Sequence, residues 1–419
     1  MRICLITPEF PPYQTGGIGS YVRTLAEGYG ARGHAVDVVG CDLHPDEPEV
    51  RHPWGRSLSL PAAATPVGGP AAAAGERALR WLHRRGVPLV WRAFPLYAVR
   101  ELVARALAVR AFLAARHRRY DVVEFPNWPG EAAFVPARRA CRYVARLSTS
   151  ATDIDPGGSR LTVTMERRSV LRADLVVANS AAMNRKGQEY YGYPPARAVV
   201  IPHGIPDRPP VPPPPADGRV YLVSVGRAEE RKGTDLLLTA LARVLPDHPA
   251  AVYRFVGRGL PDYLARHPAA AAAWAALQAT CPGRAVDAGA VPDAELDRLV
   301  GGSHWLVAPS RFESFGLMVA EAMRFGTPAV YAAVGGLAEV GAAGPHNVAA
   351  AGNDDADLER CLRDVCARGA AAALAARPDT RAAFDTHFRA DRMIDRSLEV
   401  YAELLAARRD RAAAGGEPA

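Results

Sequence analysis

Short apolar runs alternate along the chain with longer segments rich in Ala, Leu and Arg. This alternation is typical of β-α-β units, in which helices connect the strands of a parallel sheet. The predicted strands of the first half are 2–7, 35–40, 121–125, 142–147, 175–179 and 198–201, and those of the second half are 220–225, 252–256, 285–288, 305–308 and 329–331. The pattern predicts an α/β protein with two Rossmann-like, doubly wound domains. Open sheets of this kind bind ligands at the carboxyl ends of their strands.

A proline-rich stretch separates the two alternating regions. Seven of the ten residues 206–215 are proline. Proline fixes φ and lacks an amide hydrogen, so the stretch is expected to be a stiff linker rather than a helix or a central strand. We therefore expect an N-terminal domain over 1–205, a linker over 206–218 and a C-terminal domain over 219–388. The pattern of residues 389–419 predicts a final helix that can cross back to the N-terminal domain, followed by a disordered tail.

The composition is that of an ordinary globular protein. The 419 residues are 49% hydrophobic and 23% charged, which excludes a disordered chain and a fibre. No apolar run is long enough to span a membrane, and the first residues are typical of a buried strand rather than a signal peptide. The six cysteines form no CxxC pair, so we expect buried free thiols. These features predict a cytoplasmic protein, either a monomer or a homodimer.

The basic charge has a simple interpretation. The net charge is +7, but only two of the 51 Lys and Arg residues are lysines, Lys186 and Lys232. Arginine has replaced lysine throughout, as in a GC-rich coding sequence, and no nucleic-acid-binding motif is present, so no nucleic-acid partner is expected. The low-complexity stretch 61–75 predicts a loop. The arginine-rich segment 76–119 is either an amphipathic helix packed on the first sheet or, less favoured, a helix that contacts anionic lipid.

Candidate chemistry begins after the first strand of the second domain. Gly226 and Arg227 follow that strand, and Lys232 precedes a helix that starts near Thr234. A glycine and two cations at a helix N-terminus suit a diphosphate. The alternative is a solvated charged turn, because two acidic residues lie inside it. A lysine in a chain that otherwise uses arginine favours the anion site.

A second cluster follows the strand 305–308. Glu313 lies in a loop, a helix is expected to begin near Phe315, and Glu321 lies on that helix. The amides at the helix start would point toward a bound anion. Two carboxylates eight residues apart, one before the helix and one on it, can flank one bound molecule. The alternative is an N-cap glutamate together with a surface glutamate.

The two clusters together resemble the retaining, metal-independent glycosyltransferases of family 4, which have the GT-B fold of two Rossmann-like domains facing an interdomain cleft. The patterns that carry the resemblance are G-R-x-x-x-x-K-G from Gly226 and P-S-x-x-E-x-F-G-x-x-x-x-E-A from Pro309. The segments 289–296 and 335–339 and the glycine loop that contains Gly16, Gly17 and Gly19 extend it over nearly the whole chain.

The resemblance implies a role for each matching residue. Arg227 and Lys232 would hold the donor diphosphate and neutralise the leaving nucleotide, and Glu313 would contact the reacting sugar; these three are the expected catalytic residues. The implied donor-binding residues are Gly17, Gly226, Arg227, Lys232, Glu313, Ser314, Phe315, Gly316, Leu317 and Glu321, with Glu321 on the ribose. The implied acceptor-binding residues are Gly16, Gly17, Ser148 and Thr149. No metal and no cofactor is expected besides the nucleotide-diphosphate sugar as co-substrate.

Two positions depart from the family pattern. Ser148 stands where the family usually has a histidine that aligns the donor sugar, and Gly257-Arg258-Gly259 replaces the usual Gly-Asp-Gly near the base. His203 and His304 are interpreted as structural, so neither replaces the missing histidine. Asp153 and Asp155 form a DxD sequence, but that metal motif belongs to a different glycosyltransferase fold.

The sequence therefore predicts transfer of a sugar from a UDP- or GDP-sugar to a small-molecule acceptor, as in specialised metabolism. Two alternatives keep the same fold. One is a nucleotide-sugar epimerase or a phosphorylase-like enzyme, and the other is a catalytically silent protein that binds nucleotide sugar.

Overall fold

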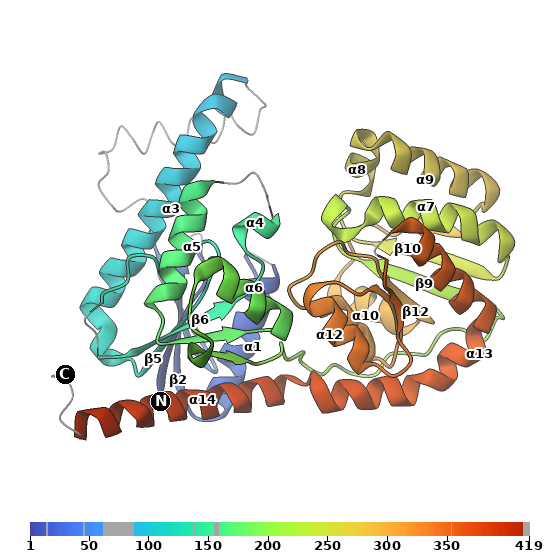
Figure 1. Ribbon diagram of the computed structural model, residues 1–419. Helices are drawn as coiled ribbons and strands as arrows, with labels where there is room; N and C mark the ends of the chain where they lie inside the picture. Colours follow the sequence, from blue (N-terminus) through green and yellow to red (C-terminus); the bar gives the residue numbers. More distant parts are fainter. Residues whose placement is uncertain are drawn as a thin grey trace. The chain divides into compact units, whose positions relative to one another are not determined.

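The computed structural model describes residues 1–13, 16–44, 47–61, 88–137, 140–154, 159–352 and 354–413. Of residues 88–99, 154 and 408–413 it describes the backbone alone. The chain forms two compact units (Figure 1). Unit 1 comprises Met1–Asn179, Met183–Ile201 and Met393–Ala419, and unit 2 comprises Ser180–Ala182 and Pro202–Arg392. The predicted loop over 61–75 lies, from residue 62 onward, outside the described residues.

Unit 1 is built on an eight-stranded sheet with the order β3-β4-β2-β1-β5-β6-β7-β8. Its strands are β1 (Arg2–Ile6), β2 (Ala35–Cys41), β3 (Glu49–His52), β4 (Gly55–Leu60), β5 (Val122–Pro126), β6 (Arg142–Leu147), β7 (Leu175–Ala178) and β8 (Ala198–Val200). All neighbouring strands are parallel except β3 and β4, which form an antiparallel hairpin at the edge. The sequence did not predict this hairpin, because an edge strand with one solvated face alternates polar and apolar residues and lacks a continuous apolar run.

Helices complete the layers of unit 1 (Figure 1). They are α1 (Gly17–Ala31), α3 (Pro88–Arg116), α4 (Ala151–Ile154), α5 (Arg160–Arg172) and α6 (Ala181–Tyr191), with the short 3-10 helices η2 (His117–Arg119) and η3 (Pro195–Arg197). The part of α3 with described side chains buries Leu102, Ala106, Val109, Phe112 and Leu113. This part of the arginine-rich segment is therefore an amphipathic helix packed in the core. Residues 76–87 of that segment lie outside the described residues.

The last helix, α14 (Ala390–Ala413), packs on unit 1 around a buried ion pair. The Nε of Arg146, on β6, lies 2.6 Å from Oε1 of Glu124, on β5, and both side chains are almost fully buried. From α14, the Ser397 hydroxyl lies 3.1 Å from Arg146 Nη2, and the Tyr401 hydroxyl donates to Glu124. Residues of α14 thus help to satisfy charges that are buried beneath the helix.

Unit 2 repeats the architecture with a six-stranded, wholly parallel sheet of order β11-β10-β9-β12-β13-β14. Its strands are β9 (Val220–Val225), β10 (Ala251–Val256), β11 (Ala285–Asp287), β12 (Trp305–Ala308), β13 (Ala329–Ala332) and β14 (Val348–Ala350). Its helices are η4 (Glu230–Lys232), α7 (Thr234–Val244), η5 (Leu245–Asp247), α8 (Leu260–Arg266), α9 (Pro268–Thr280), α10 (Asp293–Gly301), α11 (Leu317–Arg324), α12 (Gly335–Ala343) and α13 (Asp355–His387). The central neighbours β9 and β12 end beside each other, which is where open α/β sheets bind ligands.

The expectation of buried cysteines is met in this structure. All six lie in the described part of the chain, are buried and form no disulfide. In the part of the chain that is described, no helix combines the length and the apolar character that a membrane span requires.

Candidate functional site

The site in unit 2 begins with glycines that allow close backbone contact. Gly226 follows β9 with a φ of 141°, and Gly257 follows β10 with a φ of 154°. A Cβ at Gly257 would lie 1.7 Å from the Gly226 carbonyl oxygen, so no side chain fits there. Gly233 has a φ of 67°. A Cβ at Gly233 would lie 2.0 Å from the Pro309 carbonyl oxygen, so no side chain fits there either. These contacts place the turn that carries Lys232 directly beside the loop after β12.

Lys232 and Glu313 meet between these two loops. The Lys232 ammonium forms an ion pair with Glu313 Oε1, which also accepts a 3.2 Å hydrogen bond from the Ser310 hydroxyl. The Arg231 guanidinium lies 3.9 Å from the other oxygen of the same carboxylate. The side chains of Lys232 and Glu313 remain 20% and 12% exposed. The carboxylate is thus oriented by a cation that a ligand can still reach.

Arg227 differs from the other cations of this turn. Its side chain is 72% exposed, and its partner Glu229 is 3.7 Å away. Arg231 is held more tightly, by Glu229 at 2.6 Å and by the Phe312 carbonyl oxygen at 3.2 Å. Arg227 is therefore free to turn toward a ligand, whereas Arg231 braces the loop. The sequence interpretation missed Arg231, although a third basic residue next to Lys232 was a usable signal.

A small cavity collects several of the predicted residues. Gly226, Arg227 and Lys232 line it together with Ser310 and Met318, and its volume is about 20 Å³. The structure thus brings the first predicted cluster and the loop after β12 to one place at the carboxyl ends of the two strands.

The loop before α11 contributes mainly its backbone. The helix begins at Leu317, two residues later than expected, because Gly316 has a φ of 105° and is not helical. The Phe315 ring is buried, 5.1 Å from the His203 ring and 6.0 Å from the Phe388 ring. The Ser314 carbonyl oxygen accepts a hydrogen bond from the Ser180 hydroxyl at 2.9 Å. Phe315 can therefore offer a ligand its amide group but not its side chain.

Glu321 lies in the second turn of α11. Burial raises the pKa of its carboxyl above the usual range, and the charges of Arg324 and Arg208 oppose that shift. A carboxyl in this position suits hydrogen bonds with hydroxyl groups better than an ion pair with another cation.

Two glycines at the start of α12 support the Glu313 loop from behind. The Gly336 amide donates to the Glu313 carbonyl oxygen at 3.0 Å. A Cβ at Gly336 would lie 2.1 Å from the Ser314 carbonyl oxygen, and one at Gly335 would lie 2.4 Å from that of Glu313. The backbone of the loop is therefore fixed by direct contact with α12.

We expect Gly336→Ala to displace this loop and to reduce turnover at least about tenfold, because a shift of about 1 Å in a positioned group has effects of this size or larger. Gly218→Ala is the control for turnover: a Cβ there meets nothing within 4 Å, and the strain from its φ of 80° should lower the melting temperature without changing turnover. Steady-state turnover and melting temperature of both variants check the prediction. Equal turnover of Gly336→Ala and the parent protein would contradict it.

In unit 1, the predicted residue Ser148 belongs to a buried hydrogen-bond network. Its amide and its hydroxyl donate to Asn127 Oδ1 at 2.7 and 3.1 Å. The Asn127 side-chain amide donates to the Tyr191 hydroxyl at 3.0 Å, which in turn donates to Glu166 at 3.1 Å. Glu166 also accepts the Ala151 amide at 3.0 Å. The loop after β6, which includes the half-buried Thr149, is therefore fixed by hydrogen bonds at Ser148 and at Ala151.

Glu166 makes this network sensitive to pH. Burial raises its pKa to about 7, although the hydrogen bonds from Ala151 and Tyr191 lower it. The unfolded chain has a pKa near 4.3 here, so the folded state binds more protons between the two values. The free energy of unfolding therefore falls as pH rises from about 4.3 to about 7, by up to about 4 kcal/mol.

Glu166→Gln is expected to remove this part of the pH dependence, because the amide resembles the protonated carboxyl. Glu189→Gln, which changes an exposed residue on the neighbouring α6, should leave it in place. Urea unfolding between pH 5 and 8 measures the difference. An unchanged slope in Glu166→Gln would show that Glu166 titrates normally.

The start of α1 contains an unexpected carboxylate. The Gly19 amide donates to Glu9 Oε1 at 2.9 Å, and a Cβ at Gly16 would lie 2.3 Å from that oxygen. Glu9 therefore lies at the amino end of α1, beside Gly16 and Gly17, where the sequence suggested close approach of a phosphate. The sequence interpretation overlooked Glu9, since nothing in the glycine loop indicates that the chain folds back on itself.

The remaining candidate residues have local roles. Asp153 accepts hydrogen bonds from Ser150 and pairs with Lys186, and its DxD partner Asp155 lies outside the described residues. His304 accepts the Tyr221 amide at 3.0 Å, and burial lowers its pKa to about 4, as suits a structural residue. Within the described ranges, no three His, Cys, Asp or Glu side chains are grouped as metal ligands.

Comparisons with known proteins agree with this arrangement. The family described as Glycosyl transferases group 1 matches residues 210–378, and the Glycosyltransferase Family 4 matches residues 15–208. A D-inositol 3-phosphate glycosyltransferase of Geodermatophilus obscurus is 30% identical over 96% of this chain and 88% of its own. A glycogen synthase of Mycobacterium tuberculosis is 30% identical over 90% of this chain and 89% of its own.

Solved structures show the same fold. Sucrose-phosphate synthase from Thermosynechococcus elongatus superposes with a TM-score of 0.71 and 20% identity, and covers 97% of this chain and 99% of its own. WaaG, a glycosyltransferase involved in lipopolysaccharide biosynthesis, has a TM-score of 0.64 and 16% identity, with 95% and 99% covered. The chain therefore belongs to glycosyltransferase family 4, has the GT-B fold with two Rossmann-like domains, and is a glycosyltransferase.

Proposed function

We propose that the protein transfers a sugar from a nucleoside-diphosphate donor to a small-molecule acceptor, with retention of the anomeric configuration and without a metal ion. The observation that carries the proposal is the Lys232–Glu313 ion pair at the carboxyl ends of β9 and β12, with Arg227 exposed beside it. A cation suited to a diphosphate and a carboxylate suited to sugar hydroxyls lie in contact, as a donor that contains both groups requires.

In the proposed reaction, the acceptor hydroxyl attacks the anomeric carbon from the face that the leaving group vacates. The bond from the anomeric carbon to the phosphate oxygen breaks, and the departing phosphate oxygen takes the acceptor proton. Arg227 and Lys232 stabilise the negative charge that develops on the diphosphate, which is the role a metal ion has in other transferases. Glu313 binds the sugar hydroxyls, and no covalent intermediate with the protein forms.

Most of the proposed donor contacts lie in unit 2, and the proposed acceptor contacts lie in unit 1. Besides Arg227, Lys232 and Glu313, the proposed donor contacts are Gly226, the 314–317 backbone and Glu321 on the ribose. Ser148, Thr149, Gly16 and Gly17 are the proposed acceptor contacts, and Gly17 is also assigned to the donor. A serine hydroxyl cannot accept a proton at neutral pH as a histidine can, which leaves the departing phosphate as the base.

The relatives suggest which substrates to test. HepE from Anabaena has a structure in complex with UDP and glucose, and the catalytic domain of starch synthase IV from Arabidopsis thaliana has one with ADP and acarbose. A UDP- or GDP-sugar is the proposed donor, with an ADP-sugar as comparison. The acceptor is proposed to be a small hydroxylated molecule of a specialised biosynthetic route.

The test is release of nucleoside diphosphate from UDP-glucose, UDP-N-acetylglucosamine, GDP-mannose and ADP-glucose. Each donor is incubated with inositol 3-phosphate or a panel of small alcohols, in EDTA and in Mg²⁺. We expect one donor to turn over equally in both buffers and NMR to show a product with retained configuration. Turnover that requires Mg²⁺, or an inverted product, would overturn the proposal. Epimerised donor or free sugar phosphate would instead indicate the epimerase or phosphorylase-like reaction.

A further inference from the structure

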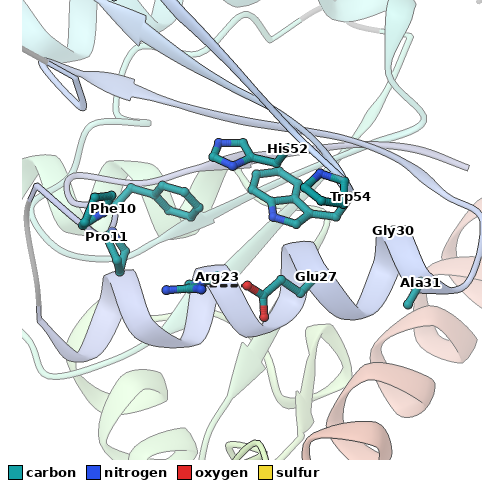
Figure 2. A pocket seen from close by; sticks show the side chains of 10 residues that line it. Phe10, Pro11, Arg23, Glu27, Gly30, Ala31, His52 and Trp54 are labelled. Atoms are coloured by element: carbon teal, nitrogen blue, oxygen red, sulfur yellow. Dashed lines mark hydrogen bonds and ion pairs between the residues drawn. The ribbon is translucent and has the colours of Figure 1, made fainter. Parts of the chain in front are cut away.

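Unit 1 contains a cavity whose lining shares no residue with the proposed donor and acceptor contacts. Its volume is about 700 Å³, within the range of about 300–1,000 Å³ that small-ligand sites occupy. It lies between the loop after β1, the outer face of α1 and the turn that connects β3 to β4 (Figure 2). The turn belongs to the edge hairpin, and the cavity is therefore built partly from the element that the sequence did not predict.

One side of the cavity is aromatic. The rings of His52 and Trp54 are stacked, with centroids 4.4 Å apart and an interplanar angle of 6°. The buried Phe10 ring packs edge-on against both, at 6.1 and 5.9 Å. Trp54 is only partly buried, so part of this aromatic surface faces the cavity (Figure 2).

The aromatic side is held rigidly. A Cβ at Gly30 of α1 would lie 2.6 Å from Trp54 Cβ, so the turn rests directly on the helix. The buried Ser57 hydroxyl is 2.7 Å from Nε2 of His52 and 2.7 Å from Nε2 of His44, which fixes the His52 ring. A surface that is already in place loses little entropy when a ligand binds.

The opposite side is polar and has no net charge. Arg23 and Glu27, one turn apart on α1, form an ion pair of 2.7 Å and remain 56% and 46% exposed (Figure 2). Arginine has five donor hydrogens and a carboxylate has about four acceptor sites, so both keep groups for a ligand. Burial, together with the charges of His44 and Arg23, lowers the pKa of His52, which is therefore neutral at pH 7.

We propose that this cavity binds a neutral saccharide, with a pyranose ring lying on Trp54 and its hydroxyls bonded to Arg23 and Glu27. A pyranose has an apolar face of C–H groups that packs on an aromatic ring, and hydroxyls that both donate and accept hydrogen bonds. The pair carries no net charge, so neither an anionic nor a cationic ligand gains a net attraction from it. The proposal is independent of the donor site, because it requires none of the residues of unit 2.

Saturation-transfer difference NMR on the full-length protein tests the proposal with maltotriose and methyl α-glucopyranoside as probes. We expect signals from both saccharides, a loss of at least about tenfold in affinity in Trp54→Leu and in Arg23→Ala, and near-normal binding in Trp54→Phe, which keeps an aromatic face. Arg396→Ala is the matched control, since Arg396 forms a similar exposed pair with Glu399 on α14 of the same unit.

Each outcome decides the proposal without any turnover measurement. Excess UDP, GDP or ADP should leave the saccharide signals in place if the cavity of unit 1 is the site. No signal from either saccharide, or undiminished signal in Trp54→Leu, would overturn the proposal. Displacement by a nucleotide would place the saccharide in the transfer site instead. Melting temperatures show whether each variant is folded.

Discussion

Lys232→Ala is expected to reduce sugar transfer by about 10²- to 10³-fold or more, the effect of removing one preorganised group from a developing negative charge. Two losses combine in this variant. The diphosphate loses a cation, and Glu313, which is almost buried, loses the ammonium that orients it. The second loss means that the melting temperature must be measured together with turnover.

Two further variants show whether the loss of turnover is specific to the position and chemistry of Lys232. Arg243→Ala removes an exposed cation of unit 2 that pairs with Asp355 at 3.0 Å, and should leave turnover unchanged. Lys232→Arg keeps the charge but replaces a compact ammonium with a planar guanidinium, so we expect an intermediate loss. Normal turnover of folded Lys232→Ala would refute the assignment of the phosphate site.

Arg146→Met is expected to have the largest effect on stability, about 3–5 kcal/mol of the free energy of unfolding. The substitution leaves the Glu124 carboxylate buried without its guanidinium partner. It also removes the hydrogen bond that connects β6 to Ser397 of α14. Urea unfolding measures the change.

The double variant Arg146→Met/Glu124→Leu separates the two causes. Replacing a whole buried pair by apolar residues is often neutral or stabilising, so the double variant should recover most of the loss. If the single variant costs less than about 1 kcal/mol, the pair does not anchor α14 as described.

The general fold could be predicted because its signal is local. Buried parallel strands appear in the sequence as continuous apolar runs. The predicted strands of both units therefore end within about one or two residues of the observed strands. The strands β3, β4 and β14 were missed for different reasons. The sequence of β4, Gly55–Leu60, alternates polar and apolar residues, and β14, Val348–Ala350, contains two alanines, which have a low strand propensity.

The candidate site also contains some residues that the sequence could predict and others that it could not. Arg227, Lys232 and Glu313 stand out because their residue types occur at fixed distances from strand ends. The network from Ser148 to Glu166 could not be predicted, since it joins the loops after β5 and β6 to residues of α5 and α6, which only the folded sheet brings together. Glu9 was missed because its contact with the start of α1 depends on the path of a loop.

The cavity near Trp54 depends on tertiary structure throughout. Its aromatic residues come from the loop after β1 and from the edge hairpin, and its ion pair comes from α1. Along the sequence, Arg23 and Glu27 are an ordinary i,i+4 pair on a helix surface. Only the close contact between Gly30 and Trp54 gives that pair a ligand-binding environment.

The central claim, that Lys232 binds the diphosphate of the donor, is tested most directly by calorimetric titration in EDTA. The nucleoside diphosphate of the best donor and its monophosphate are each titrated into the parent protein and into Lys232→Ala. We predict that the parent protein binds the diphosphate at least about tenfold more tightly than the monophosphate, about 1.4 kcal/mol, and that Lys232→Ala loses most of this preference. An undiminished preference for the diphosphate in Lys232→Ala would contradict the claim.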